Sequence, residues 1–88
     1  MNVRRYIPAP DLAMWCDEQG HPVRFVWHRR GRWVLRVERT WEVITADWLG
    51  ADEILHRRYY DLAMRDGLRC VVYRDHFTGT WHLESAHT

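Results

Sequence analysis

The chain of 88 residues is long enough for one small domain with a single core, and 47% of its residues are hydrophobic. Its six tryptophans and four tyrosines exclude an intrinsically disordered composition, in which aromatic residues are rare. The net charge of +1 favours no class of partner, and no apolar run approaches the roughly 18 residues of a membrane-spanning segment.

The first ten residues contain Pro8 and Pro10 and are expected to form an extended arm before a single domain over residues 11–88. Beyond the arm, four glycines each end a three-residue segment between runs of alternating apolar residues: 18–20, 29–31, 65–67 and 77–79. A three-residue hairpin loop places such a glycine in the left-handed backbone region. The strands are expected near residues 11–16, 22–28, 32–45, 57–64, 68–75 and 80–86.

Short strands at regular spacing, separated by turn residues, are typical of a small all-β domain. We expect an antiparallel meander of five to six strands, forming either a strongly twisted sheet or a half-closed SH3-like barrel. One segment, residues 46–56, does not fit the alternation, and it predicts a loop or one helical turn from Ala51 to His56.

The register of the hairpin near Gly31 follows from the loop that best separates apolar from polar side chains. A three-residue loop places Trp27 opposite Trp33 as a pair in the core. The same loop places Phe25 opposite Leu35, whereas a two-residue loop that contains Gly31 would pair apolar with charged residues. Equivalent reasoning predicts Trp15 beside Val23 and Leu62 opposite Cys70. In the last hairpin a four-residue loop over residues 76–79, which we prefer, places Val72 opposite Leu83, whereas a three-residue loop would place Tyr73 there.

The opposite face of the same hairpin is predicted to be basic, with Arg24 directly across from Arg36. Like charges in that position are unfavourable unless solvent, a carboxylate or an anionic partner compensates them. Phosphates of DNA or RNA would be such a partner. The predicted nucleic-acid-binding residues are Arg24, His28, Arg29, Arg30, Arg32 and Arg36, with Arg57 and Arg58 as additions. The alternative is a solvated face balanced by the acidic residues Glu42, Asp47, Asp52 and Glu53.

Three further aromatic residues, Trp48, Tyr59 and Tyr73, would anchor a protein interface if they are exposed. Their alternative role is a second layer of the core. The second hypothesis for function is therefore a protein–protein adaptor, or a domain that self-associates through an edge strand.

Catalytic and metal-binding patterns are missing from the sequence. The six histidines lack metal-site spacing, so we expect no metal, although His28, His76, His82 and Asp75 could assemble a site in space. No nucleophile with an oriented base and no glycine-rich phosphate loop is evident, so we expect no catalytic residue, no cofactor and no enzyme activity. Asp75 is expected to accept hydrogen bonds from its own turn.

The chain also has no pattern that would direct it out of the cytoplasm. Its first residues lack the apolar segment of a secretory signal, and Cys16 and Cys70 are too few for a disulfide scaffold. We therefore expect a cytoplasmic protein that contacts no membrane.

A series of short motifs runs through the second half of the chain. In order they are Trp41, DW (47–48), RRYY (57–60), DG (66–67), YRD (73–75) and TGTWHLE (78–84), preceded by GHPVRF (20–25). This order resembles a small bacterial domain of unknown function, found as short free-standing proteins and at the C-terminus of ImuB-type proteins. Those proteins are catalytically defective relatives of Y-family polymerases that act in damage-induced mutagenesis.

The resemblance implies an accessory role in DNA repair, with contact to DNA or to a polymerase-like or recombinase-like protein, and no catalytic residue. Two positions depart from the pattern: Leu49 stands where a second tryptophan is expected, and His82 where tyrosine is common.

Overall fold

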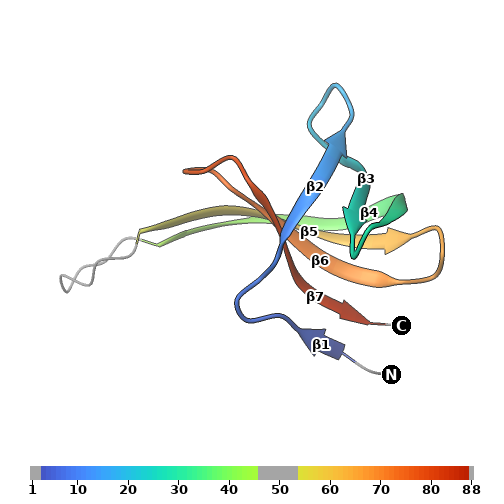
Figure 1. The fold of residues 1–88 in the computed structure, drawn as a ribbon. Helices are drawn as coiled ribbons and strands as arrows, with labels where there is room; N and C mark the ends of the chain where they lie inside the picture. Colours follow the sequence, from blue (N-terminus) through green and yellow to red (C-terminus); the bar gives the residue numbers. More distant parts are fainter. Residues whose placement is uncertain (1–2, 46–53, 88) are drawn as a thin grey trace.

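The computed structural model describes residues 3–45 and 54–87 and consists of antiparallel strands joined by turns (Figure 1). The strands are β1 (Val3–Arg5), β2 (Asp11–Cys16), β3 (Pro22–Trp27), β4 (Arg30–Thr45), β5 (Leu55–Met64), β6 (Arg69–Asp75) and β7 (Trp81–His87). The all-β prediction is confirmed, and the six expected strands correspond to β2–β7. Within these ranges no helix is long and apolar enough to cross a membrane.

Six strands close into a barrel in the order β7-β2-β3-β4-β5-β6, because β6 also pairs with β7. The sheet is therefore closed, as in small SH3-like barrels. The segment expected as an arm contains β1, which adds to β7 outside the barrel. One edge of β7 is shared, since Trp81 and His82 pair with β2, whereas residues 85–87 pair with β1.

The core is built from side chains on the inner face of the barrel. Its largest fully buried members are Phe25 on β3, Leu62 on β5 and Leu83 on β7. The complete buried cluster is Leu12, Phe25, Tyr60, Leu62, Met64, Cys70, Val72, Leu83 and Ala86. These residues come from β2, β3, β5, β6 and β7. On five of the six barrel strands, therefore, apolar residues of the alternating pattern face the core.

Three of the four predicted glycine loops are present, and each has its glycine in the left-handed region: Gly20 at φ 83°, Gly67 at φ 91° and Gly79 at φ 73°. Each loop also begins near an aspartate, Asp17, Asp66 or Asp75, whose Oδ1 accepts backbone N–H groups of its own turn. The expected role of Asp75 is thus confirmed. In the first loop, the N–H of His21 contributes most to holding the pKa of Asp17 below its usual value.

The predicted pairs on β5, β6 and β7 are confirmed: Leu62 lies opposite Cys70, and Val72 lies opposite Leu83. The prediction for β2 is wrong by one residue, because a bulge between Trp15 and Cys16 shifts the register beyond the loop. Trp15 therefore lies opposite Arg24 and not beside Val23.

The predicted register of the β3–β4 hairpin is wrong. Its turn lies on His28 and Arg29, with φ values of 52° and 63°, so Trp27 pairs with Arg30. Two central residues with positive φ define a type I′ turn, whose twist matches that of the flanking strands. Gly31 is therefore a strand residue and takes no part in the turn.

This shift reverses the expected sides of β4. Phe25 faces the core as predicted, but Trp33 and Leu35 are 50% and 56% exposed. A bulge between Val34 and Arg36 leaves Leu35 without a partner on β5, and Val34 packs against the core in its place.

The distal parts of β4 and β5 extend to one side of the barrel, where the β6–β7 turn lies beside them (Figure 1). A backbone hydrogen bond joins β5 to this turn: the N–H of His76 donates to the carbonyl of His56 at 2.9 Å. Because Leu55 and His56 belong to β5, the helical turn expected to end at His56 is wrong there. Residues 46–53 lie outside the described residues.

Candidate functional site

A row of alternating aromatic and arginine side chains crosses the outer face of β2, β3 and β4. Arg24 lies opposite both Trp15 on β2 and Trp33 on β4. Its guanidinium carbon is 4.8 Å from the Trp15 ring and 5.6 Å from the Trp33 ring. Arg65, the residue that follows β5, extends the row beyond Trp33: its guanidinium carbon lies 5.6 Å from the centre of the Trp33 ring. We call these four residues the Trp–Arg row.

The row is exposed. Trp15 and Trp33 retain 49% and 50% of their accessible surface, and with Arg24 they line a shallow cavity of about 620 Å³. In the described part of the chain, neither Arg24 nor Arg65 forms an ion pair with a carboxylate. Cation–π contacts hold both guanidinium groups in place while leaving their charge uncompensated.

The backbone at Gly31 makes room for the row. A Cβ atom at this position would overlap with Nη2 of Arg24 and lie 3.0 Å from its Cζ. Arg24 therefore extends from β3 across the bare backbone of β4. Gly31 thus allows the Arg24 side chain to pass close to the backbone of β4. The turn beside it is made by His28 and Arg29.

Arg32 was predicted to lie on this outer face, and that is wrong. It lies opposite Phe25, on the inner side of the hairpin, and its side chain is only 17% exposed. Its Nη1 donates to Asp66 Oδ2 at 2.6 Å, and its guanidinium lies 5.7 Å from the Trp27 ring. The three-residue shift in register, which moves the partner of Trp27 from Trp33 to Arg30, exposes Trp33 and turns Arg32 inward, where Asp66 neutralises it.

Two other predicted arginines also lie away from the row. Arg36 is not opposite Arg24, because it pairs with Ala63, and its side chain forms an ion pair with Glu38. Arg58 lies 3.4 Å from a carboxylate oxygen of Glu42. These contacts match the alternative of a solvated face balanced by carboxylates. The continuous basic face predicted for the hairpin is therefore wrong.

The turn itself retains the predicted basic character. His28 packs against Trp27, with 4.3 Å between the ring centroids. Arg29 and Arg30 are exposed, and among the described residues they have no carboxylate partner. With Arg24 on the same hairpin, they are the predicted nucleic-acid-binding arginines of this hairpin that have no carboxylate partner in the described part of the chain.

The aromatic residues predicted for a protein interface are placed differently. Tyr59 and Tyr73 are each 7% exposed and pack against one another, with ring centroids 5.1 Å apart and ring planes tilted by 41°. Trp41 extends the stack beside Tyr59, and His82 extends it beside Tyr73. An exposed interface at Tyr59 and Tyr73 is thus corrected to the alternative, a second aromatic layer, because β5 and β6 are covered on both faces. Trp48 lies outside the described residues.

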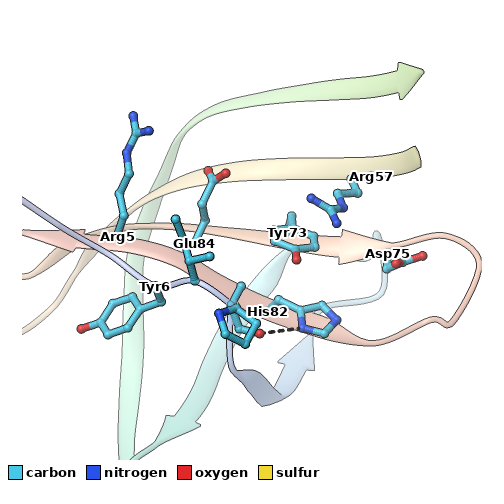
Figure 2. Close-up of a pocket in the computed structure, with 10 residues that line it drawn as sticks. Arg5, Tyr6, Arg57, Tyr73, Asp75, His82 and Glu84 are labelled. Atoms are coloured by element: carbon cyan, nitrogen blue, oxygen red, sulfur yellow. Dashed lines mark hydrogen bonds between the residues drawn. The ribbon is translucent and has the colours of Figure 1, made fainter. Parts of the chain in front are cut away.

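A cavity of about 470 Å³ lies between the segment that follows β1 and the strands β5–β7 (Figure 2). Arg57, also predicted to bind nucleic acid, lines it with its guanidinium 4.4 Å from the Tyr73 ring. Burial raises the pKa of Tyr73, although Arg57 acts in the opposite direction. Since Asp75 and Glu84 line the cavity together with Arg5 and Arg57, its charges are mixed and favour no single class of ligand.

The two cysteines are free, and neither has the properties of a nucleophile. Burial raises the pKa of the Cys70 thiol to about 12. Cys16 is exposed, yet burial of part of its side chain and the nearby Asp17 also raise its pKa. A reactive cysteine needs a lowered pKa, because the thiolate is the reacting form.

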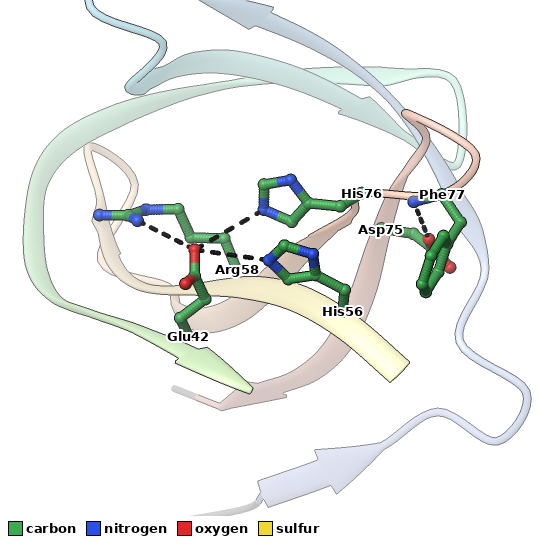
Figure 3. Close-up of polar contacts among 6 residues, drawn as sticks. All are labelled: Glu42, His56, Arg58, Asp75, His76 and Phe77. Atoms are coloured by element: carbon green, nitrogen blue, oxygen red, sulfur yellow. Dashed lines mark hydrogen bonds and ion pairs between the residues drawn. The ribbon is translucent and has the colours of Figure 1, made fainter. Parts of the chain in front are cut away.

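The histidine arrangement differs from the one considered from the sequence. His82 lies 3.1 Å from Asp11, far along the chain from the turn that holds His28. The structure instead brings Glu42, His56 and His76 together (Figure 3). Spacing along one strand did not reveal this group, because each of the three comes from a different element.

Sequence reasoning also missed Trp15, Trp33 and Arg65. The signal that could have found them is the exposure of a tryptophan next to an arginine on adjacent strands, which depends on register. A register error of three residues, an odd number, placed Trp33 in the core. Comparisons with protein-family models, with curated proteins and with solved structures found no match.

Proposed function

We propose that this domain is a non-enzymatic module that binds single-stranded nucleic acid through the Trp–Arg row, with Arg29 and Arg30 as additional phosphate contacts. The observation that supports the proposal is the exposed alternation of Trp15, Arg24, Trp33 and Arg65 across neighbouring strands.

Two physical features of the row suit a single strand. Bases stack on exposed aromatic rings, and each such stack contributes roughly 1–3 kcal/mol. A guanidinium group donates to phosphate oxygens in a planar fork. Because Trp15 and Trp33 flank Arg24, two stacking surfaces and a phosphate-binding group lie next to one another. Paired bases of a duplex cannot reach a flat surface in this way, so single strands are the preferred ligand.

The setting of this function rests on the motif resemblance described above. We place the domain in the cytoplasm, as an accessory factor of DNA repair beside a polymerase-like or recombinase-like partner. The free cysteines Cys16 and Cys70 are compatible with a reducing compartment.

Titration of fluorescently labelled oligonucleotides, read by anisotropy at two salt concentrations, tests the proposal. Trp33→Ala removes one stacking surface and is expected to weaken binding of a single strand by roughly 5- to 150-fold. Arg24→Ala is expected to weaken binding and to reduce its salt dependence, since one phosphate contact is lost. Arg36→Ala is the matched control: Arg36 is already paired with Glu38 and should leave the affinity unchanged.

Absence of binding at low salt would refute the proposal, as would an affinity unchanged in both Trp33→Ala and the double variant Arg29→Ala with Arg30→Ala. The same exposed tryptophans favour a protein–protein adaptor as the second candidate. In that case Trp33→Ala would abolish a complex that is insensitive to salt, and oligonucleotides would not compete for it.

A further inference from the structure

One group of metal-ligating side chains lies apart from the Trp–Arg row. Oε1 of Glu42 is 3.8 Å from Nε2 of His56 and 3.9 Å from Nε2 of His76. The three donor atoms all lie within 4.8 Å of one another. Figure 3 shows both imidazole rings directed at the same carboxylate oxygen.

Backbone pairing holds the three residues together. His56 on β5 lies opposite Ile44 of β4, two residues beyond Glu42 and on the same face of the sheet. His76 begins the β6–β7 turn, and its N–H donates to the carbonyl of His56. The two imidazole rings stack with 4.0 Å between their centroids, and Phe77 packs edge-on against His56. Strand pairing, the hydrogen bond and ring stacking together therefore fix how the three side chains lie.

One donor atom of the group lacks a partner. Nε2 of His56 is inaccessible to solvent and forms no hydrogen bond with any described residue. A buried polar atom without a partner is unfavourable, and such atoms in a folded protein call for a physical explanation. A metal ion between His56, His76 and Glu42 would satisfy this atom without any change of fold.

The geometry points to a zinc-binding site made by Glu42, His56 and His76, with a fourth position open to water or a small anion. Histidine nitrogen and carboxylate oxygen are ligands that Zn²⁺ prefers, with bonds of about 2.0–2.2 Å in a tetrahedral arrangement. Such bonds place neighbouring ligand atoms roughly 3.3–3.5 Å apart. The observed Oε1–Nε2 separations of 3.8 and 3.9 Å are slightly longer than this range, and all three donor atoms lie within 4.8 Å of one another.

Arg58 bounds the site from the side of the barrel. Its Nη1 lies 3.4 Å from Oε1 of Glu42, the oxygen that also faces both histidines. Arg58 and His76 also line a neighbouring cavity of about 330 Å³. The guanidinium opposes a cation at this point, so its removal is expected to strengthen zinc binding. A residue that only maintained the fold would not have this effect.

The test uses the full chain, purified without a histidine tag and freed of metal. Zn²⁺ is titrated in competition with a chromophoric indicator. One equivalent is expected to bind at micromolar concentration or below, and His56→Gln and His76→Gln are each expected to weaken binding at least tenfold. His28→Asn is the matched control, because it removes a histidine outside the group and suits the positive φ of that turn. Arg58→Ala is expected to bind Zn²⁺ at least as tightly as the unaltered chain.

Two results would overturn the site: less than one equivalent bound at 100 µM Zn²⁺, or unaltered affinity in folded His56→Gln and His76→Gln variants. If a histidine variant does not fold, Glu42→Gln replaces it, since Glu42 is partly exposed and its substitution preserves side-chain volume. Nitrogen NMR provides the direct signature, because Zn²⁺ should shift Nε2 of His56 and His76. Shifts confined to His21, His82 or His87 would contradict the assignment. None of these outcomes depends on whether the Trp–Arg row binds oligonucleotides, so the two proposals can fail independently.

Discussion

The β3–β4 and β5–β6 hairpins carry nearly the same turn segment, Arg-Arg-Gly and Arg-Asp-Gly, and fold it in different ways. In β5–β6 the glycine, Gly67, closes the loop at φ 91°. In β3–β4 the turn lies on His28 and Arg29 and so ends two residues before Gly31, which accommodates Arg24. The difference teaches that a glycine after two polar residues indicates a nearby turn but does not identify its own role.

The aspartate is the physical reason for the difference. Asp66 accepts the N–H of Leu68 through Oδ1 and so stabilises a loop that ends at Gly67. The equivalent position in β3–β4 is Arg30, which has no acceptor for such a bond. Without the aspartate, the hairpin adopts the tighter type I′ turn and accepts positive φ at two residues with side chains.

The largest expected effect separates the two sides of the β3–β4 hairpin. Phe25→Ala should lower the free energy of unfolding by about 3–5 kcal/mol, because Phe25 is fully buried. Leu35→Ala should change it by less than about 0.5 kcal/mol, since Leu35 is 56% exposed. Denaturant unfolding measures both. Comparable losses for the two variants would restore the register in which Phe25 and Leu35 form a core pair.

An intermediate effect compares the glycines directly. Gly67→Ala should cost about 1–2 kcal/mol, because an L-residue at φ 91° is strained although nothing lies within 4 Å of the added Cβ. Gly20→Ala is the control at φ 83° and should behave alike. Gly31→Ala should cost less than about 1 kcal/mol, since the added Cβ would meet only the far end of the long Arg24 side chain, which can shift. Its main effect should be weaker oligonucleotide binding. A larger loss of stability at Gly31 than at Gly67 would contradict the assigned roles.

The smallest expected effect comes from optimising the unusual turn. His28→Asn combined with Arg29→Gly introduces the pair that type I′ turns prefer and should raise the free energy of unfolding by about 0.5–1 kcal/mol. The same pair at Arg65 and Asp66 should be destabilising, because it removes the acceptor for Leu68 and the partner of Arg32. Thermal unfolding of the two double variants gives the sign of each change. Stabilisation at both places would mean that the two turns do not differ as described.

The fold was predictable where local chemistry and alternation agree. In β5, β6 and β7 the Asp–Gly loops set the register, and apolar pairs such as Leu62 with Cys70 follow from it. Alternation failed on β4 because Arg32 occupies an inner position. Its aliphatic part packs inside, while its guanidinium reaches Trp27 and Asp66. A prediction that assigns every arginine to the outer face therefore turns the wrong face of this part of β4 toward the core.

The candidate sites were less predictable because both depend on neighbours from separate strands. The arginines of the hairpin were identified, yet which of them retains an uncompensated charge depends on contacts such as Arg36 with Glu38. Trp15 joins Arg24 only through the bulge in β2. His56 and His76 are twenty positions apart in the numbering and meet only because β5 pairs with β6. Sequence spacing alone contains none of this information.

The closure of the barrel also determines how the molecule should open. β4 and β5 are paired from Val34 with Met64 to Thr45 with Leu55, whereas β2 meets β7 only at Asp11 with His82 and Leu12 with Trp81. Local opening begins where the fewest hydrogen bonds must break together. The amides around this short seam should therefore exchange with solvent fastest, and the barrel should relax into an open sheet by releasing β2 and β3 together. Trp15 and Arg24, the half of the Trp–Arg row that lies on these strands, would then move as one unit, hinged on β4.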